Sequence, residues 1–74
     1  MRKSGRIRGT VTYLNENGQR TRIPLGPCEI EEYGAPNKVA ATIWWNDEYG
    51  VHKTDLSELE WAQYGKSKSF TIDD

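Results

Sequence analysis

Apolar and polar side chains alternate along most of this chain, with the period of two that is typical of strands with one buried face. Residues 6–14 follow this pattern through Ile7, Val11 and Tyr13, and residues 19–23 continue it after a turn. Further strands are predicted at residues 27–33, 39–45, 51–54 and 68–72. The pattern therefore predicts six short strands, with a turn at residues 34–37 between the third and fourth.

The first two strands are predicted to form a hairpin. Gly18 can take a positive φ at no steric cost, which favours a three-residue loop at residues 16–18. That register places Tyr13 opposite Thr21 and gives each strand one apolar face. The inner face then carries Val11, Tyr13 and Ile23, and the outer face carries Arg8, Arg20 and Arg22.

Two consecutive tryptophans lie in residues 39–45, the most apolar run of the chain and the expected central strand. Successive side chains of a strand point to opposite faces, so Trp44 and Trp45 cannot both enter the core. The phase of the strand predicts that Trp45 is inside and Trp44 is outside.

One short helix is predicted before the last strand. Asp55 with Glu58 matches a capping box, and Gly65 is a typical left-handed stop at the other end. At about 100° per residue, an apolar stripe contains Leu56, Leu59 and Ala62. Trp61 and Tyr64 point away from this stripe.

These elements predict a mainly β, small α+β fold, built as a compact, strongly bent antiparallel sheet or a small barrel of five to six short strands. The order of the elements resembles that of Src homology 3-like barrels. This resemblance covers the element order alone and implies an architecture, since such folds host many unrelated functions. Residues 1–5 are expected to form a mobile basic arm, and residues 6–72 a single β-rich domain.

The charges are unevenly distributed although the net charge is only -1. The first 25 residues contain six basic side chains and one acidic side chain, which gives +5, and the remainder contains four basic and ten acidic side chains, which gives -6. The small net charge argues against a general polyanion binder. The acidic residues are expected to form an ordinary solvated surface.

The reactive residue types are scarce. Cys28 and His52 are single, so an intramolecular disulfide and a zinc site of Cys and His ligands are excluded. No acidic motif for calcium is present, and we expect no cofactor, no metal and no catalytic site. A lone cysteine and the absence of an apolar leader or a spanning run of about 20 residues predict a cytoplasmic protein that does not enter a membrane.

The leading functional hypothesis is a small non-enzymatic protein-binding module, an adaptor or inhibitor. Its expected apolar anchors are Trp44, Trp61 and Tyr64, because tryptophan and tyrosine are enriched at binding hot spots. A structural alternative is that Trp44 packs against Trp61 as a second small core. A homodimer that buries the outer aromatic residues is a further hypothesis.

The other binding hypothesis is a nucleic-acid-binding module that acts through an arginine-bearing hairpin face. The expected phosphate contacts are Arg6, Arg8, Arg20 and Arg22. A structural alternative pairs Arg20 and Arg22 with Glu29 and Glu31 across neighbouring strands. A protein partner is preferred over nucleic acid.

Overall fold

The computed structural model describes residues 2–34 and 38–73, so residues 35–37 of the expected turn lie outside the described residues. The described part contains, in order, β1 Lys3–Ile7, β2 Thr12–Leu14, β3 Arg20–Arg22, β4 Gly26–Glu32, β5 Ala41–Asp47, β6 Gly50–Leu56, α1 Glu58–Ser67 and β7 Phe70–Asp73. This confirms a mainly β protein with one short helix before the last strand.

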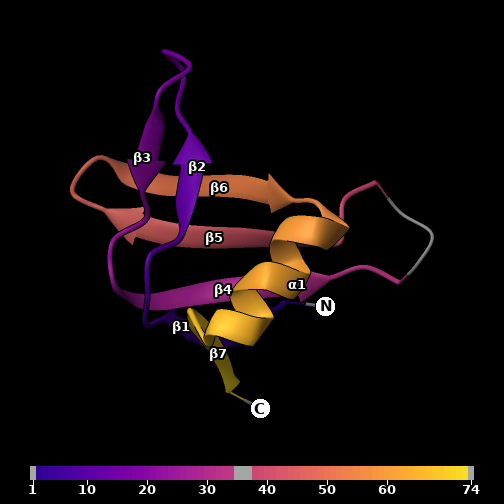
Figure 1. Cartoon of the computed structure of the whole chain (residues 1–74). Coiled ribbons are helices and arrows are strands. Elements are labelled where there is room, and N and C mark those ends of the chain that lie inside the picture. Colours follow the sequence, from indigo (N-terminus) through magenta and orange to yellow (C-terminus); the bar gives the residue numbers. More distant parts are fainter. Residues whose placement is uncertain (1, 35–37, 74) are drawn as a thin grey trace.

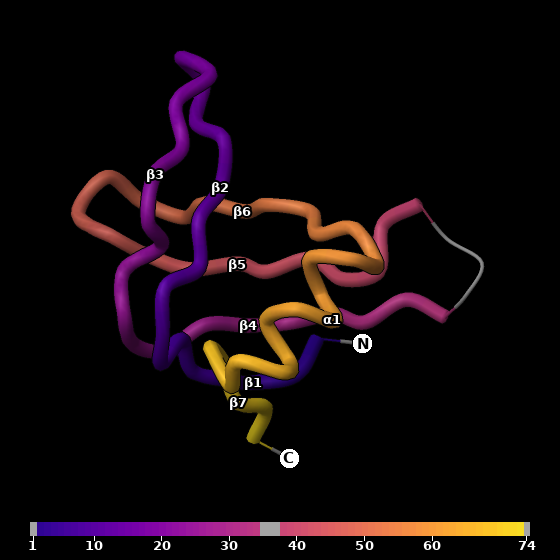
Figure 2. The backbone as a smooth tube through the Cα atoms, in the orientation of Figure 1, coloured from indigo at the N-terminus to yellow at the C-terminus, as the bar shows by residue number. Residues whose placement is uncertain are grey.

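Two layers make up the molecule (Figure 1). Five strands form an antiparallel sheet in the order β6-β5-β4-β1-β7, and β2 and β3 form a separate two-stranded sheet. The β2–β3 hairpin and α1 lie over the same face of the five-stranded sheet, which we call the inner face (Figures 1 and 2). Among the described strands, β6 and β7 remain edges, so the sheet does not close into the barrel that we considered.

The expected long strand at residues 6–14 is divided into β1 and β2, so the described residues contain seven strands. The backbone N–H groups of Arg8 and Gly9 both donate to the carbonyl oxygen of Ser69, at 2.7 and 2.9 Å. A Cβ atom on Gly9 would lie 3.1 Å from the Cα of Ser69, so this close approach favours glycine. The contact lets the chain leave the large sheet and cross over it as the hairpin.

The beginning of the chain differs from the expected arm. The structure places Lys3, Ser4 and Gly5 in β1, between β4 and β7. Gly5 lies opposite Cys28 on one side and Ile72 on the other. Paired strand structure therefore begins at Lys3 and not at residue 6.

The predicted hairpin register is confirmed. Tyr13 lies opposite Thr21, and Gly18 has a φ of 77°. The side-chain oxygen of Asn15 accepts hydrogen bonds from the backbone N–H groups of Asn17 and Gln19, at 2.9 and 3.0 Å. These two bonds fix the three-residue loop from within, as short polar side chains do in turns.

The core lies between the two layers. Its buried members come from the hairpin and from the inner face of the large sheet: Ile7, Val11, Ile23, Cys28, Ile30, Ile43, Trp45 and Leu56. The ring of Trp45 meets that of Tyr13 edge-on, with centroids 4.9 Å apart. Trp45 is 3% exposed, which confirms its inward phase.

The helix begins two residues later than predicted. Its N-cap is Ser57, which forms a capping box with Glu60, whereas Asp55 belongs to β6 and accepts a 2.7 Å hydrogen bond from the hydroxyl of Thr42. The helix also ends beyond Gly65, because Lys68 takes the left-handed C-cap with a φ of 56°. Both predicted ends are therefore wrong.

The buried face of α1 is also the reverse of the predicted one. Leu59 is 69% exposed, whereas Trp61 and Tyr64 are partly buried and pack against the core. Trp61 stacks on Phe70 with ring centroids 4.6 Å apart. Two large aromatic side chains remove more apolar surface from water than Leu59 and Ala62 would, so the helix turns its aromatic face inward.

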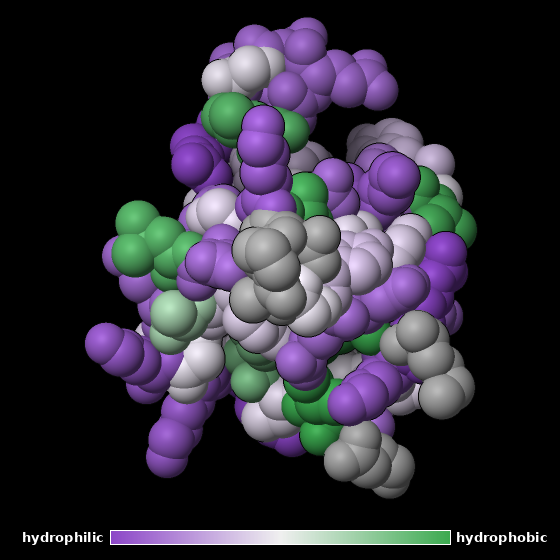
Figure 3. All heavy atoms as spheres, turned by 90° about the vertical axis from the view of Figure 1, so that its right-hand side faces the viewer, coloured by the Kyte–Doolittle hydropathy of each residue, from purple (hydrophilic) through white to green (hydrophobic). Residues whose placement is uncertain are grey.

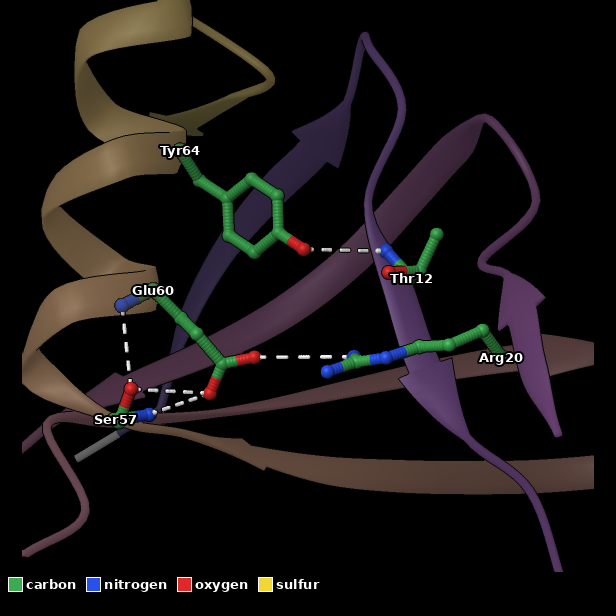
Figure 4. Close-up of polar contacts among 5 residues, drawn as sticks. All are labelled: Thr12, Arg20, Ser57, Glu60 and Tyr64. Carbon is green, nitrogen blue, oxygen red and sulfur yellow. Dashed lines mark hydrogen bonds and ion pairs between the residues drawn. The ribbon is translucent and has the colours of Figure 1, made fainter. Parts of the chain in front are cut away.

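Polar contacts join α1 to the hairpin (Figure 4). The backbone N–H of Thr12 donates to the hydroxyl of Tyr64 at 3.4 Å. Arg20 lies 4.0 Å from Glu60, whose other carboxylate oxygen closes the capping box with Ser57. The side chains are exposed enough that the ion pair stabilises little, but together the contacts set the position of the hairpin.

Candidate functional site

Large apolar side chains gather at one end of the molecule. Among the described residues, the exposed ones are Leu14, Leu25, Tyr33, Tyr49, Val51 and Leu59. Four of these six, Leu14, Leu25, Tyr49 and Val51, line two hollows that meet at Val51. The opposite end, seen in Figure 3, presents mainly hydrophilic side chains with small separate apolar patches.

The first hollow lies on the outer face of the large sheet, the face turned away from α1 and the hairpin. It measures about 490 Å³, and its lining includes Arg2, Arg6, Leu25, Trp44 and Val51. We call it the outer-face hollow. No described secondary-structure element lies over this face (Figure 1).

Trp44 is the aromatic member of the outer-face hollow that points outward from the sheet. The guanidinium of Arg2 lies 3.9 Å from the centroid of its ring and 3.6 Å from the carboxylate of Glu29. A cation over a tryptophan face contributes about 0.5–1 kcal/mol at an exposed site. Arg2 therefore partly covers Trp44 and is held there by weak contacts.

The second hollow lies at the free edge of β6, below the overhanging hairpin. It measures about 520 Å³ and is lined by Tyr13, Leu14, Asn15, Glu16, Asn17, Tyr49, Val51, His52 and Lys53. We call it the edge hollow. Figures 1 and 2 show the loop between β2 and β3 projecting past β6. The contacts with α1 hold the base of the hairpin over the sheet. The tip of the hairpin therefore extends beyond β6 (Figure 1).

The β5–β6 turn beside the edge hollow contains a short polar contact between Asp47 and His52. Asp47 lies 2.9 Å from the Nε2 of His52 and accepts a 2.7 Å hydrogen bond from the N–H of Tyr49. Burial acts to raise the pKa of Asp47, but the hydrogen bonds from Tyr49 and His52, the charge of His52 and the N–H of Gly50 lower it below its usual value. The carboxylate therefore stabilises the turn in its ionised form.

Stability should consequently depend on Asp47 in acid. A lowered folded-state pKa contributes stability that is present above the unfolded pKa of about 3.9 and is lost as the pH falls through the folded value. As the pH falls from about 5 to about 3, the free energy of unfolding should decrease less for Asp47→Asn than for the wild type. Urea unfolding at each pH measures this difference. Equal losses in both proteins would contradict the role assigned to this carboxylate.

The three expected aromatic anchors do not share a surface. Trp44 lies on the outer face, whereas Trp61 and Tyr64 pack between α1 and the inner face. Trp44 and Trp61 are thus on opposite sides of the sheet, so the alternative in which they pack together is wrong. Of the three, Trp44 is the residue that the structure places in a hollow at the surface.

The four expected phosphate-binding arginines do not share a surface either. Arg6 lines the outer-face hollow, and the Nε of Arg8 donates to the hydroxyl of Thr71 at 3.2 Å. Arg20 and Arg22 lie in the other sheet, on β3. The expected single hairpin face is wrong because residues 6–14 are divided between the two sheets.

The predicted pairing of Arg20 and Arg22 with Glu29 and Glu31 is also not what the structure shows. In the described chain β3 pairs with β2 and not with β4. Arg20 instead approaches Glu60. Glu29 approaches Arg2.

The two single reactive residues both border the hollows: Cys28 lines the outer-face hollow, and His52 lines the edge hollow. Cys28 is buried, and burial, with a smaller effect of the Asp73 charge, raises its pKa to about 11, so the thiol is protonated at neutral pH. Within residues 2–34 and 38–73 no three His, Cys, Asp or Glu side chains are grouped as a metal site. In the same ranges no helix has the length and apolarity required to cross a membrane.

Sequence reasoning missed Leu14, Leu25, Tyr49 and Val51 as members of a site. A usable signal was present for Leu14, because it is apolar at an outward position of the hairpin, opposite Arg20. Tyr49 lies in a turn, where large apolar side chains have little to pack against. Apolar residues in such positions indicate a surface patch only once the fold brings them together.

Scans against protein-family models, curated proteins and solved structures each found no match.

Proposed function

We propose that this protein is a small non-enzymatic protein-binding module, an adaptor or inhibitor. The observation that carries the proposal is the clustering of four of the six exposed large apolar side chains around the two hollows. Contiguous apolar patches on a small domain typically mark interaction sites. We define the docking surface as Leu14, Leu25, Trp44, Tyr49 and Val51.

Within this surface, Trp44 and Val51 are the central contacts. Trp44 supplies a large ring beside the guanidinium of Arg2, in a hollow that Arg6 also lines, and Val51 borders both hollows. Tryptophan and arginine are the residue types most enriched at binding hot spots. The charged residues at the rim set the orientation of the partner, because exposed charges influence approach more than affinity.

Nucleic acid is a weaker candidate than a protein partner. The arginines that motivated it are divided between two sheets, which leaves Arg2 and Arg6 beside the outer-face hollow together with Glu29 and Asp73. Mixed charges of this kind do not form the basic stripe that tracks phosphates. A cytoplasmic location remains part of the proposal and fits a buried free thiol.

The proposal is tested by placing a charge in the docking surface. Val51→Asp should release partners that the tagged wild-type protein captures from cells that naturally contain it, because a carboxylate in an apolar contact must be desolvated. Leu59→Asp is the matched control, since Leu59 is 69% exposed and Val51 is 70% exposed. Loss of the same partners with both variants, or with the control alone, would contradict the proposed surface.

A further inference from the structure

β6 is a long and open edge strand. It spans seven residues from Gly50 to Leu56, pairs with β5 on one side, and has no described strand on its other side. The other edge, β7, is four residues long. An edge of this length presents unpaired backbone N–H and C=O groups on which another extended chain can pair.

The surroundings of β6 leave room for one added strand. The hairpin tip overhangs the edge, and the edge hollow of about 520 Å³ lies between the tip and β6. On the inner side, an added strand would place alternate side chains in this hollow, against Tyr13, Leu14 and Tyr49. The hairpin overlies this space, so the space fits a single extended segment. It does not fit the β6 edge of a second copy of the chain, because that edge has its own overhanging hairpin.

The charges of β6 define the complementary sequence. Lys53 and Asp55 lie on the outer face, where their cross-strand neighbours on β5 are Trp44 and Thr42. Lys53 is exposed and has no ion pair among the described residues. Opposite charges directly across a strand pair are favourable, so an acidic residue fits beside Lys53 and a basic residue fits beside Asp55.

We propose that a protein partner adds an extended segment to β6 as a sixth strand of the large sheet. The segment has apolar side chains on its inner face, an acidic residue opposite Lys53 and a basic residue opposite Asp55. The inference rests on the proposed function, because it names how the partner binds to the docking surface.

A synthetic peptide with this pattern tests the inference. The probe is Thr-Lys-Val-Glu-Val-Thr, acetylated and amidated, added to the full chain while amide hydrogen exchange is followed by NMR. Alternate amides of β6, those that point away from β5, should exchange about tenfold more slowly when the peptide is present at ten times its Kd. Two control peptides are the same sequence with Lys in place of Glu and the same sequence N-methylated at every residue.

Charge exchange supplies a matched variant. Lys53→Glu should lose the protection given by the original probe and gain protection from the peptide that carries Lys in place of Glu. Equal protection by the N-methylated peptide, or no protection of β6 at any peptide concentration, would overturn strand addition. The peptide could instead shift the NMR signals of Trp44 and Val51 without slowing the amide exchange of β6. That result would contradict strand addition and leave the docking surface supported. The docking surface is tested separately, by partner capture with Val51→Asp.

Discussion

Gly5→Ala should destabilise the protein by about 3 kcal/mol, near the upper end of the range for an overpacked core. A Cβ atom at Gly5 would lie 2.6 Å from the carbonyl oxygen of Thr71 and 2.9 Å from the Cδ1 of Ile30. The first of these contacts is with backbone, so β7 would have to move away from β1. Since a small domain has a total stability on the order of 5 kcal/mol, the loss is a large fraction of it.

Urea unfolding followed by tryptophan fluorescence measures this effect. Gly65→Ala is the matched control, because the added Cβ would meet no atom within 4 Å beyond its chain neighbours and the nearby backbone of its own helix, α1. Alanine in a helix interior is favoured over glycine by about 1 kcal/mol, so this variant should be more stable than the wild type. An unfolding midpoint of Gly5→Ala equal to that of the wild type would contradict the packing of β1 against β7.

The two neighbouring tryptophans should give opposite results. Trp45→Ala should cost about 3–5 kcal/mol, because Trp45 is 3% exposed and fills the space between the sheet and Tyr13. Trp44→Ala should cost only about 1 kcal/mol, mainly through the lost contact with Arg2. Partner binding should be lost with Trp44→Ala, whose fold is retained.

Urea unfolding separates the two roles, and partner capture is measured only on variants that remain folded. Trp45→Phe keeps most of the buried ring and supplies a folded variant if Trp45→Ala does not fold. It should retain the partners that Trp44→Ala loses. Similar stability losses at both positions, or full retention of partners by Trp44→Ala, would contradict the assignment of one tryptophan to the core and the other to the docking surface.

Local patterns in the sequence were sufficient for much of the fold. The hairpin register follows from Gly18 and from the apolar phase of Val11 and Tyr13, and the structure confirms it. The inward phase of Trp45 follows from alternation in the same way. These features depend on neighbours in sequence, which a pattern can describe.

The predicted start of the helix was wrong because two capping patterns overlap. Asp55 and Ser57 are each followed three residues later by glutamate, at Glu58 and Glu60. The sheet selects the second pattern. Leu56, the last residue of β6, is 1% exposed, so the chain stays extended until the side chain of Leu56 is buried. Tertiary burial thus overrides the first of two equivalent local signals.

The candidate site was the least predictable part because it depends on contacts distant in sequence. The division of residues 6–14 depends on Ser69, about sixty positions along the chain, which accepts hydrogen bonds from Arg8 and Gly9. That division separates the arginines and sends the hairpin across the sheet, where Leu14 lines the edge hollow together with Tyr49 and Val51. No local pattern contains this information.

Site-specific photo-crosslinking is the most direct test of the proposed function. A photoreactive amino acid is placed at Val51 in one protein and at Leu59 in another, and crosslinks are formed in cells that naturally contain the protein. We expect a defined protein crosslinked at Val51 and absent at Leu59, because these similarly exposed positions lie on different elements, β6 and α1. Crosslinks to that protein at Leu59 and none at Val51 would contradict it.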